Sequence, residues 1–415
     1  MNSAMPGRLA TASEAITTWL QPLRPVLDPC DRIDWRRLAG VADALDRVLT
    51  HSPVGAALLA GAERSSRLRA IRRDLARHVD TTRDPDLFQL LTQFMCGYCD
   101  IDLRDTFGLG HGRLIGRHGS AQAQQRWIPR LLAGELAGIA VTEPHGGSRP
   151  AETHTCAVAG SDGTWRVTGR KTWIGRLTEA AVFVLFFRAP DGGLAAAAVD
   201  ATEPGLRRQP IPPTGLAGWA WGVLDLDEVK IRQEDVLHGD GMLLLREHFA
   251  GYRPLVTATA LGGAAAVFDA VTARLSARKA AGDLHRVRDS ALITLGRTHV
   301  QLATGLLGAV TASHLAEGGH PAAELWGAAT KAHGIDTANS ATAELALLLG
   351  ASGFRADCQT AKIRRDLSGL LYADGIHDSL YRTAGKQHAT TKDTARDITA
   401  VPTPRGRSAS VAMTA

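Results

Sequence analysis

AVTEPHGGS, residues 140–148, is the stretch of this chain that decides its fold. The string closes a predicted strand and opens a tight turn that contains two glycines. Glycine lets backbone amides approach a ligand closely, and the hydroxyl groups of Thr142 and Ser148 can hydrogen-bond to a bound ring or phosphate. Taken alone, the string fits a purely structural strand and turn slightly better than a binding site.

The chain before this stretch is predicted to be helical. Apolar residues recur three and four positions apart, as they do on one face of an α-helix. The predicted helices cover residues 35–50, 64–78, 85–99 and 121–132. We therefore expect residues 1–136 to form an α-helical domain.

The character of the chain changes after residue 136. Short alternating or apolar runs, rich in β-branched and aromatic residues, are separated by turns, which is typical of an all-β domain. The predicted strands include residues 164–168, 181–188 and 222–231. The inward side of the last of these strands switches around Asp227 and Glu228, which predicts a β-bulge. We expect this β-domain to cover residues 137–240.

Helical periodicity returns towards the C-terminus. Four long stretches with short links predict a helical bundle over residues 241–400. These stretches are residues 251–281, 286–317, 322–349 and 376–395. A Pro-, Ser- and Arg-rich tail, residues 401–415, is predicted to be disordered. The fold class is therefore α+β, with an N-terminal helical domain, a middle β-domain and a C-terminal four-helix bundle.

Composition excludes several classes of protein. The 415 residues have 45% hydrophobic and 21% charged side chains, as in an ordinary globular protein. The net charge of +5 is not gathered into a basic run, so we expect no nucleic-acid partner. No window approaches the roughly 18 apolar residues of a membrane helix, and the N-terminus does not resemble a signal peptide. We therefore expect a cytoplasmic protein without a membrane partner.

The cysteines and histidines predict neither redox nor metal chemistry. Five cysteines, odd in number and widely spaced, favour a reducing compartment. Cys96 and Cys99 form a CxxC, but they lie in an apolar helical run and are predicted to be buried core residues. The 15 histidines show neither HExxH nor a paired metal-ligand spacing, so no metal site is predicted.

Several motifs, in order and with sensible spacing, resemble those of the acyl-CoA dehydrogenases. The 140–148 string resembles that family's TEPxxGS flavin-binding turn. GRKTWI at residues 169–174 is similar to its GxKxWI strand, whose aromatic residue, here Trp173, stacks beside the flavin. Arg278 resembles the arginine that reaches the FAD pyrophosphate of a neighbouring subunit. The glycine-rich turn at residues 350–354 resembles the one that holds the FAD adenosine.

The resemblance continues almost to the end of the chain. Arg365-Asp366 stands eight residues before Asp374-Gly375, which is the spacing between the family's RD pair and its catalytic EG. The similarity runs from about Arg117 onwards, whereas the first 115 residues resemble the family only in being helical.

This resemblance implies FAD as the cofactor and an acyl thioester as the substrate. The residues that it places at the cofactor are Val141, Thr142, Gly147, Ser148, Trp173, Ile174, Gly175, Arg278, Gly350, Ala351, Gly375 and Ile376. Those that it places near the substrate are Tyr252, Arg253 and Tyr372. It also implies a homotetramer or homodimer, because the family's FAD site is shared between subunits. Whether CoA or a carrier protein bears the acyl group stays open, as does the identity of the electron acceptor.

Asp374 is the candidate catalytic base. Desaturation of a thioester removes an acidic α-proton and transfers a β-hydride to flavin N5. The base must lie in a dry pocket, where burial raises the affinity of a carboxylate for a proton. Asp374 follows the apolar run 370–373, a position that equally suits a helix N-cap, but the family spacing favours the base. Tyr252 stands at the family's alternative base position and cannot serve as a carboxylate there.

Several departures from the family pattern bear on the cofactor. Gly175 and Arg176 stand where a hydroxyl residue normally follows WI, so a hydrogen bond to the flavin is lost and a positive charge is added. Leu347 replaces a glutamine on the adenosine side, and Ile376 replaces a threonine. These changes point to a specialised acyl-thioester dehydrogenase, in secondary metabolism. Two alternatives stay open: a flavin-dependent monooxygenase on the same fold, and a non-catalytic scaffold or carrier-protein-binding subunit.

Overall fold

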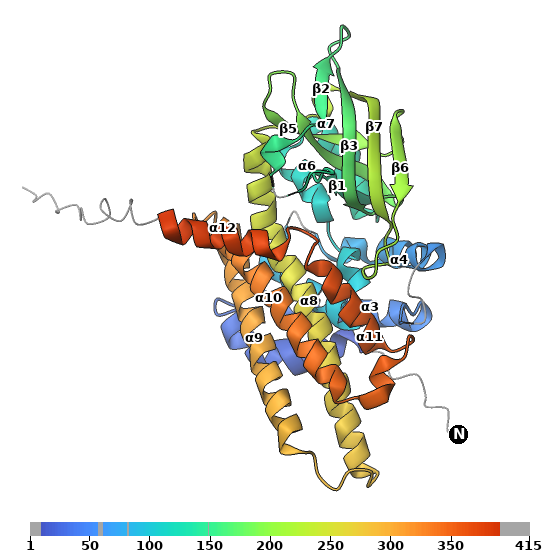
Figure 1. Cartoon of the computed structure of the whole chain (residues 1–415), viewed down its shortest axis with the longest axis vertical. Helices are drawn as coiled ribbons and strands as arrows, with labels where there is room; N and C mark the ends of the chain where they lie inside the picture. The colour runs from blue at the N-terminus through green and yellow to red at the C-terminus, as the bar shows by residue number, and fades with distance from the viewer. Residues whose placement is uncertain (1–9, 57–60, 81–82, 148, 391–415) are drawn as a thin grey trace, which may run out of the picture.

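The computed structural model describes residues 10–56, 61–80, 83–147 and 149–390 (Figure 1). The N-terminal region, where apolar residues recur with helical periodicity, forms a layer of helices. The α-helices of this part are α1 (Ala12–Ala15), α2 (Arg24–Leu27), α3 (Trp35–His51), α4 (Ala62–Leu75), α5 (Asp86–Cys99), α6 (Arg113–His118) and α7 (Ala121–Leu132). The four predicted helices are confirmed as α3, α4, α5 and α7. The tail predicted to be disordered and Ser148 lie outside the described residues.

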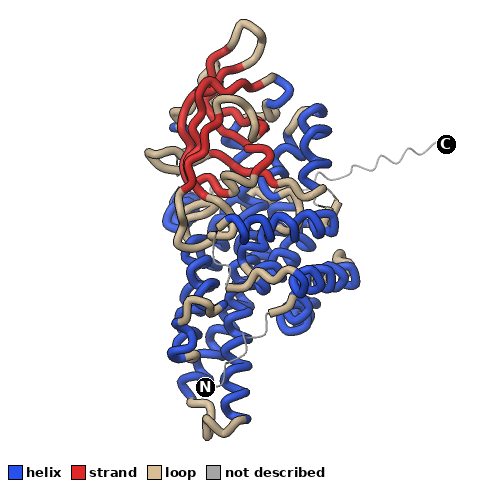
Figure 2. The backbone as a smooth tube through the Cα atoms, turned by 90° about the vertical axis from the view of Figure 1, so that its right-hand side faces the viewer, coloured by secondary structure: helices blue, strands red, loops and turns tan. Residues whose placement is uncertain are grey.

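Seven strands form one sheet, at the top of Figure 1 and in red in Figure 2. They are β1 (Leu136–Ala140), β2 (Cys156–Ala159), β3 (Trp165–Gly175), β4 (Ala180–Arg188), β5 (Leu194–Asp200), β6 (Leu206–Pro210) and β7 (Trp221–Ile231). The order is β1-β4-β2-β3-β7-β6, and β5 pairs with β4. β1 runs parallel to β4, whereas β3 is antiparallel to both β2 and β7. The predicted strands correspond to β3, β4 and β7.

The predicted bulge is present in β7. The register between β3 and β7 shifts between Val167 and Gly169 of β3. Opposite this point, Glu228 has a φ of 53°, in the left-handed region. One extra residue of β7 is therefore accommodated there, as the switch of its inward side predicted.

Between residues 241 and 390 the structure describes five α-helices. They are α8 (Gly241–Ala280), α9 (Asp289–Glu317), α10 (Ala323–Leu347), α11 (Gln359–Leu370) and α12 (His377–Thr390). α8 begins ten residues earlier than predicted, because the side chain of Asp240 caps it by accepting from the amides of Met242 and Leu243. α11 was not among the predicted stretches, because its buried face carries Lys362 and Asp366 and so breaks the apolar pattern.

Two glycines let α5 pack directly against α8. A Cβ atom at Gly97 would lie 1.9 Å from the carbonyl oxygen of Thr259, and one at Gly262 would lie 2.1 Å from that of Phe94. No side chain fits at either distance, so only glycine permits this approach. The contact fixes the facing sides of α5 and α8, which wall the candidate site.

A buried ion cluster joins the N-terminal helices to α11. Arg64 of α4 pairs with Asp100 at 2.9 Å and with Asp102 at 2.8 Å. Lys362 of α11 pairs with Asp100 at 2.7 Å and also with Asp366 of its own helix. The aspartate of the RD pair is therefore part of the structural junction.

The expectation that no segment is apolar enough to cross a membrane is wrong for α8, which is long and apolar enough to do so by length and composition alone. However, 78% of its most apolar 18-residue segment is buried inside the protein, as in the central helix of a bundle. We therefore interpret α8 as a core helix. All five cysteines are unpaired, and Cys96 and Cys99 are buried, as predicted.

Candidate active site

The turn after β1 is held by a buried ion pair. Lys171 of β3 donates from Nζ to Oε1 of Glu143 over 2.7 Å, and both side chains are almost fully buried. The amides of His154 and Thr155 donate to the same carboxylate over 2.7 and 2.9 Å. Burial alone would raise the pKa of Glu143, but these hydrogen bonds, chiefly that from Lys171, hold it below its usual range. Glu143 is thus the anchor of the turn, a role that sequence reasoning did not assign.

Two groups of described side chains have spacings that a metal ion would fit. They are Glu143, His145 and His154, and Asp100, Asp102 and Asp366. In both groups the carboxylates already bind cationic side chains of the protein. We therefore assign no metal to either group.

The turn and the end of β3 together present an open surface. The amide of Thr172 donates to the carbonyl oxygen of Thr142 over 2.8 Å, which ties the turn to the strand. A Cβ atom at Gly147 would lie 2.7 Å from Oγ1 of Thr142, so only glycine lets the turn close on that hydroxyl. Trp173 has a φ of 56° and a side chain that is 58% exposed. Its ring is available to stack on a planar ligand.

Three neighbouring predicted residues do not offer side chains to a cofactor. Ile174 is buried in the core of the sheet, and Val141 packs half-buried against the adjoining core. A contact from either would come through the backbone. Gly175 faces the ring of Trp221, which a Cβ atom would approach to 3.3 Å.

Asp374 lies in the turn between α11 and α12. It has a φ of 56°, and α12 begins three residues later at His377, so Asp374 is not the residue that caps this helix. Burial raises the pKa of Asp374 above its usual value. Four nearby cations oppose that rise: Arg176, Lys331, Arg104 and Arg253. A half-buried carboxylate is therefore surrounded by positive charge.

Lys331 and Arg253 hold the backbone of this turn. Lys331 Nζ donates to the carbonyl oxygens of Leu370 (2.8 Å) and Gly375 (2.7 Å). Arg253 Nε donates to the carbonyl oxygen of Asp374 (3.1 Å). Burial lowers the pKa of Lys331 to about 8. These bonds fix the turn against α8 and α10, and they give Arg253 a positioning role. Tyr372 and Ile376, in contrast, have exposed side chains on the outside of the turn.

Arg176 is buried beside the site. It forms an ion pair with Asp105, and its Nε has no hydrogen-bond partner among the residues that the structure describes. Burial alone would lower the pKa of Arg176, but the carboxylate of Asp105 raises it. Among the charges that oppose the rise in the pKa of Asp374, that of Arg176 has the largest effect. Arg176 is therefore a buried cation and not a surface residue at the end of the strand.

The ring of Tyr252 in α8 stacks on that of the buried His248 and contacts that of the buried His111 at a tilt. Its ring centroid lies 5.2 Å from that of His248 and 4.5 Å from that of His111. His111 Nδ1 and His248 Nε2 are 3.0 Å apart, so one ring donates to the other. Burial lowers the pKa of His248 to about 3 and that of His111 well below its usual value. Both rings are therefore neutral at neutral pH.

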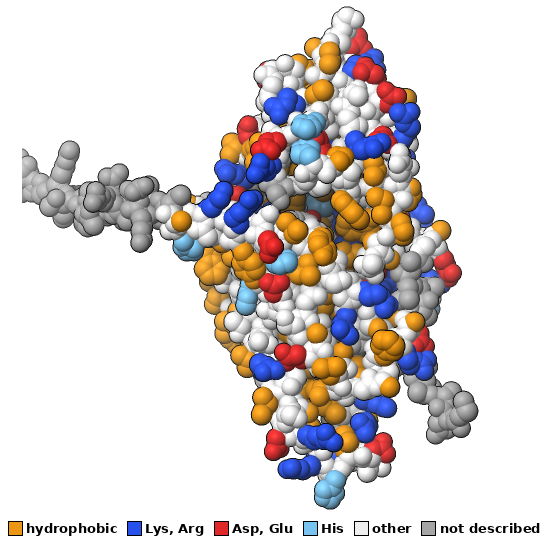
Figure 3. Space-filling model, viewed as in Figure 1, with side chains coloured by type: hydrophobic (Ala, Val, Ile, Leu, Met, Phe, Trp, Pro, Cys, Tyr) orange, Lys and Arg blue, Asp and Glu red, His pale blue; other side chains and the backbone are white. Residues whose placement is uncertain are grey.

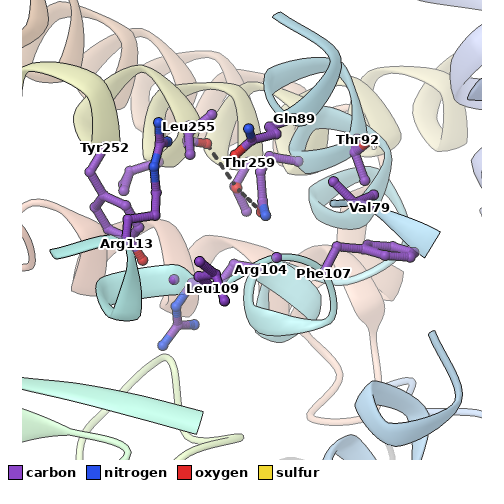
Figure 4. A pocket seen from close by; sticks show the side chains of 14 residues that line it. Val79, Gln89, Thr92, Arg104, Phe107, Leu109, Arg113, Tyr252, Leu255 and Thr259 are labelled. Atoms are coloured by element: carbon purple, nitrogen blue, oxygen red, sulfur yellow. Dashed lines mark hydrogen bonds between the residues drawn. The ribbon is translucent and has the colours of Figure 1, made fainter. Parts of the chain in front are cut away.

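A narrow cavity of about 30 Å³ lies beside Tyr252, between α5, α8 and the segment that leads into α6 (Figure 4). Tyr252 and Arg113 lie at one end of it, and Val79 and Phe107 lie at the other. Its other polar lining residues are Gln89, Thr92, Gln93, Arg104 and Thr259. Of these lining residues, the sequence analysis identified only Tyr252. Most of the others lie in the N-terminal region, which has no recognisable motif, and Thr259 lies within the apolar sequence of α8.

Three predicted cofactor residues lie far from this junction. Arg278 is in the last turn of α8, 26 residues after Tyr252, which is roughly 39 Å along a helix. Gly350 and Ala351 begin the exposed turn after α10, at the end of the bundle away from the sheet (Figure 1). Leu347, close by, is 81% exposed. Within one chain, Arg278 cannot contact a ring bound beside Trp173.

Both the sheet and the bundle match known family patterns. Residues 138–229 match the acyl-CoA dehydrogenase middle domain, and residues 239–388 match the acyl-CoA dehydrogenase C-terminal domain. Glutaryl-CoA dehydrogenase from Mycobacterium smegmatis, solved in complex with FADH2, is similar with a TM-score of 0.74 and 20% identity, over 87% of this chain and 96% of that one. The prolyl acyl carrier protein oxidase AnaB has a TM-score of 0.67 and 18% identity, over 73% and 83% of the two chains.

Curated relatives agree with this assignment. A probable short/branched chain specific acyl-CoA dehydrogenase of Dictyostelium discoideum is 27% identical over 281 residues, 66% of this chain and 68% of that protein. The acyl-CoA dehydrogenase apdG of Emericella nidulans is 32% identical over 151 residues, and the match covers 34% of each chain. This chain thus aligns with only about a third of the length of the second relative.

The matched family domains and the curated acyl-CoA dehydrogenase relatives identify the chain as an FAD-dependent oxidoreductase. The chain belongs to the acyl-CoA dehydrogenase family, which its two matched domains cover over more than half of its length. The residues present fit the planar ring of FAD, because Gly147 and Thr142 close the turn and the ring of Trp173 is exposed.

Proposed function

We propose that this protein is an acyl-thioester dehydrogenase that uses Asp374 to remove the α-proton of its substrate. The observation that carries the proposal is the placement of Asp374, in a turn fixed by Lys331 and Arg253, with a pKa that burial raises. A carboxylate with a raised pKa is a better base near neutral pH than an exposed one. The surrounding cations oppose the rise in its pKa and favour the ionised form, which is the form that accepts a proton.

The cofactor would be held by the turn and the end of β3. Thr142 and Gly147 would contact the ring through the hydroxyl and the backbone, and Trp173 would stack beside it. FAD, when bound, supplies the acceptor for the hydride that leaves the β-carbon. The α-proton goes to Asp374, so that the two hydrogens leave the substrate as a proton and a hydride.

We further propose that two or four copies assemble, because Arg278 lies too far from Trp173 to serve the same site in one chain. In a dimer, Arg278 of one subunit would contact the FAD pyrophosphate of the other. Leu292, Ile293 and Val300 of α9 are exposed and offer apolar surface for such an assembly.

The acyl group is bound to CoA or to a carrier protein, and both carriers are anionic. On the face shown in Figure 3, basic side chains gather where α12 meets the sheet domain. Such a patch would attract either carrier. The likeness to AnaB supports a carrier protein, and the likeness to glutaryl-CoA dehydrogenase supports CoA. Rates with one acyl group on both carriers decide between them.

The test is to mix FAD-loaded protein anaerobically with short and medium acyl thioesters and to follow the visible absorbance of the flavin. Bleaching with formation of the α,β-unsaturated thioester supports the proposal. Retention of FAD without bleaching by any thioester contradicts it. Oxygen consumption that depends on added reduced flavin, with an oxygenated product, would instead assign a monooxygenase.

A further inference from the structure

Gly175, at the end of β3, faces the indole of Trp221 on the neighbouring strand β7 (Figure 1). The two residues are paired in the sheet, and a Cβ atom at Gly175 would lie 3.3 Å from the six-membered ring of Trp221. The φ angle of Gly175 is not positive, so its backbone conformation is open to other residues. Space, and not backbone conformation, therefore favours glycine here. The indole of Trp221 stands where the side chain of residue 175 would otherwise be.

The ring of Trp221 faces the helical part of the protein and not the core of the sheet. Ile174 is buried in the sheet core, and successive residues of a strand point to opposite faces, so Gly175 and the ring over it face away from that core. Trp221 packs, half-buried, against the helical core that also takes in Ala373, the residue before Asp374. The ring therefore lies at the junction of β3 with the helical core, and part of its surface is open.

The indole of Trp221 is held in one orientation. Its Nε1 donates to the carbonyl oxygen of Leu216 over 3.0 Å. The amide of Leu216 in turn donates to Oδ1 of Asp366 over 2.7 Å, and Asp366 belongs to the buried ion cluster that includes Lys362. A ring that is fixed before a ligand arrives loses little conformational freedom when the ligand stacks on it.

We propose that Trp221 forms, together with Trp173, a pair of aromatic walls for the planar ring of FAD. Trp173 stands two residues before Gly175 and is 58% exposed, so both indoles border the end of β3. Aromatic rings attract other planar rings by more than the burial of their area alone. A stacking contact from Trp221 thus replaces the hydrogen bond that is lost at Gly175. This inference rests on the flavin site of the proposed function.

Two substitutions of Trp221 separate the stacking contact from the hydrogen bond. Trp221→Phe and Trp221→Leu both lose the bond to Leu216, but only phenylalanine keeps an aromatic face. Calorimetric titration of the full chain with FAD should give a Kd at least about tenfold higher for Trp221→Leu than for the unchanged protein, with Trp221→Phe between them. Equal Kd values for Trp221→Phe and Trp221→Leu would overturn the stacking contact.

The matched control is Trp165→Leu. Trp165 is half-buried like Trp221, but it stands at the start of β3, ten residues before Gly175 and roughly 33 Å away along a strand. This variant should lower the thermal stability and leave the Kd for FAD unchanged. A rise in Kd as large as that of Trp221→Leu would show that any weakening of the sheet releases FAD, and would contradict the inference.

A second pair of variants tests the exchange of a side chain for a ring. Gly175→Thr in the unchanged protein places its Cβ against the indole and should raise the Kd for FAD several-fold. In the Trp221→Leu background the same change should lower the Kd, because the space is open and the hydroxyl can hydrogen-bond to the ring. Additive effects of the two substitutions would argue against a shared position beside the flavin.

The outcomes separate this inference from the proposed function. FAD binding that depends on Trp221, in a protein whose flavin no acyl thioester bleaches, supports the inference and overturns the dehydrogenase. Bleaching by a thioester in Trp221→Leu, with an unchanged Kd for FAD, overturns the inference and leaves the dehydrogenase intact. Failure of the unchanged protein to bind FAD overturns both.

Discussion

Arg176 and Asp105 form a buried ion pair that links the end of β3 to the segment lining the cavity. Arg176 has a φ of 58° and directly follows Gly175, where the family's flavin-side hydroxyl is lost. The guanidinium is buried, and its charge opposes the rise in the pKa of Asp374. The replacement of the hydroxyl residue by Gly175-Arg176 therefore removes a cofactor contact and also adds a cation that lowers the pKa of the proposed base, Asp374.

Arg176→Gln should move the acidic limb of kcat/KM to higher pH. Asp374 must be ionised to accept a proton, and its pKa is already above the usual value because of burial. Removing the cation with the largest opposing effect raises that pKa further, so activity should fall several-fold at mildly acidic pH and recover at alkaline pH.

The control for this pH profile is Arg170→Gln. Arg170 lies on the same strand and pairs with Asp225 at the surface. An acidic limb that stays at the same pH in Arg176→Gln and in Arg170→Gln would show that Arg176 does not act on the base.

Lys171→Met should destabilise the sheet by about 3–5 kcal/mol, because it leaves the buried carboxylate of Glu143 without its cation. The free energy of unfolding from urea titration measures this loss. The double variant Glu143→Gln/Lys171→Met should recover part of it. Lys230→Met removes an exposed pair with Asp162 and should change the unfolding midpoint little. Equal losses in both lysine variants would argue against the anchoring role of Glu143.

Stability should decline on acidification below about pH 6.5 because of the histidines beside Tyr252. The pKa of His248 is about 3 in the folded protein against an ordinary value of 6.5, so between these values only the unfolded chain binds the proton. The free energy of unfolding should therefore fall with decreasing pH by up to about 1.4 kcal/mol per unit for this group. His248→Gln should flatten that slope, whereas the exposed His388→Gln should not. An unchanged slope in His248→Gln would contradict the assignment.

Gly97→Ala should disrupt the contact between α5 and α8 and cost about 1–3 kcal/mol or more, because the new Cβ would overlap the carbonyl of Thr259. Gly40→Ala is the matched control. Gly40 lies inside α3, and an added methyl group there would have nothing within 4 Å, so alanine should stabilise by about 0.5–1 kcal/mol. Thermal unfolding of the two variants checks both signs, and a stable Gly97→Ala protein would contradict the close packing.

The order of helices, sheet and bundle could be predicted from hydrophobic periodicity, and so could the bulge at Glu228. The start of α8 and the whole of α11 could not. The cap at Asp240 precedes a stretch in which periodicity is weak, and α11 buries Lys362 and Asp366 in an ion cluster whose other members lie more than 250 residues away in the chain. The opposite charges of these residues offset the cost of their burial only in the folded structure, where they are adjacent.

The candidate site was predictable only where motifs mark it. Motifs placed Trp173 and Asp374, and the structure shows the exposed ring of one and the cation-lined position of the other. Arg104 and Arg113, which line the cavity, could not be predicted from the sequence. Their burial, and the absence of a hydrogen-bond partner for the Nη1 atom of each among the described residues, follow only from three-dimensional packing. A dense run of charges in an otherwise apolar region, residues 100–113, was the one available signal.

The most direct test of the central claim compares Asp374→Asn with Asp378→Asn, an exposed aspartate in the first turn of α12. Both variants are loaded with FAD, and the flavin absorbance is followed anaerobically after addition of a thioester that bleaches the unchanged protein. If Asp374 is the base, Asp374→Asn should retain FAD and lose bleaching by at least about a thousandfold, as general-base removal does, while Asp378→Asn reacts normally. Bleaching of Asp374→Asn at the rate of the unchanged protein would contradict the account.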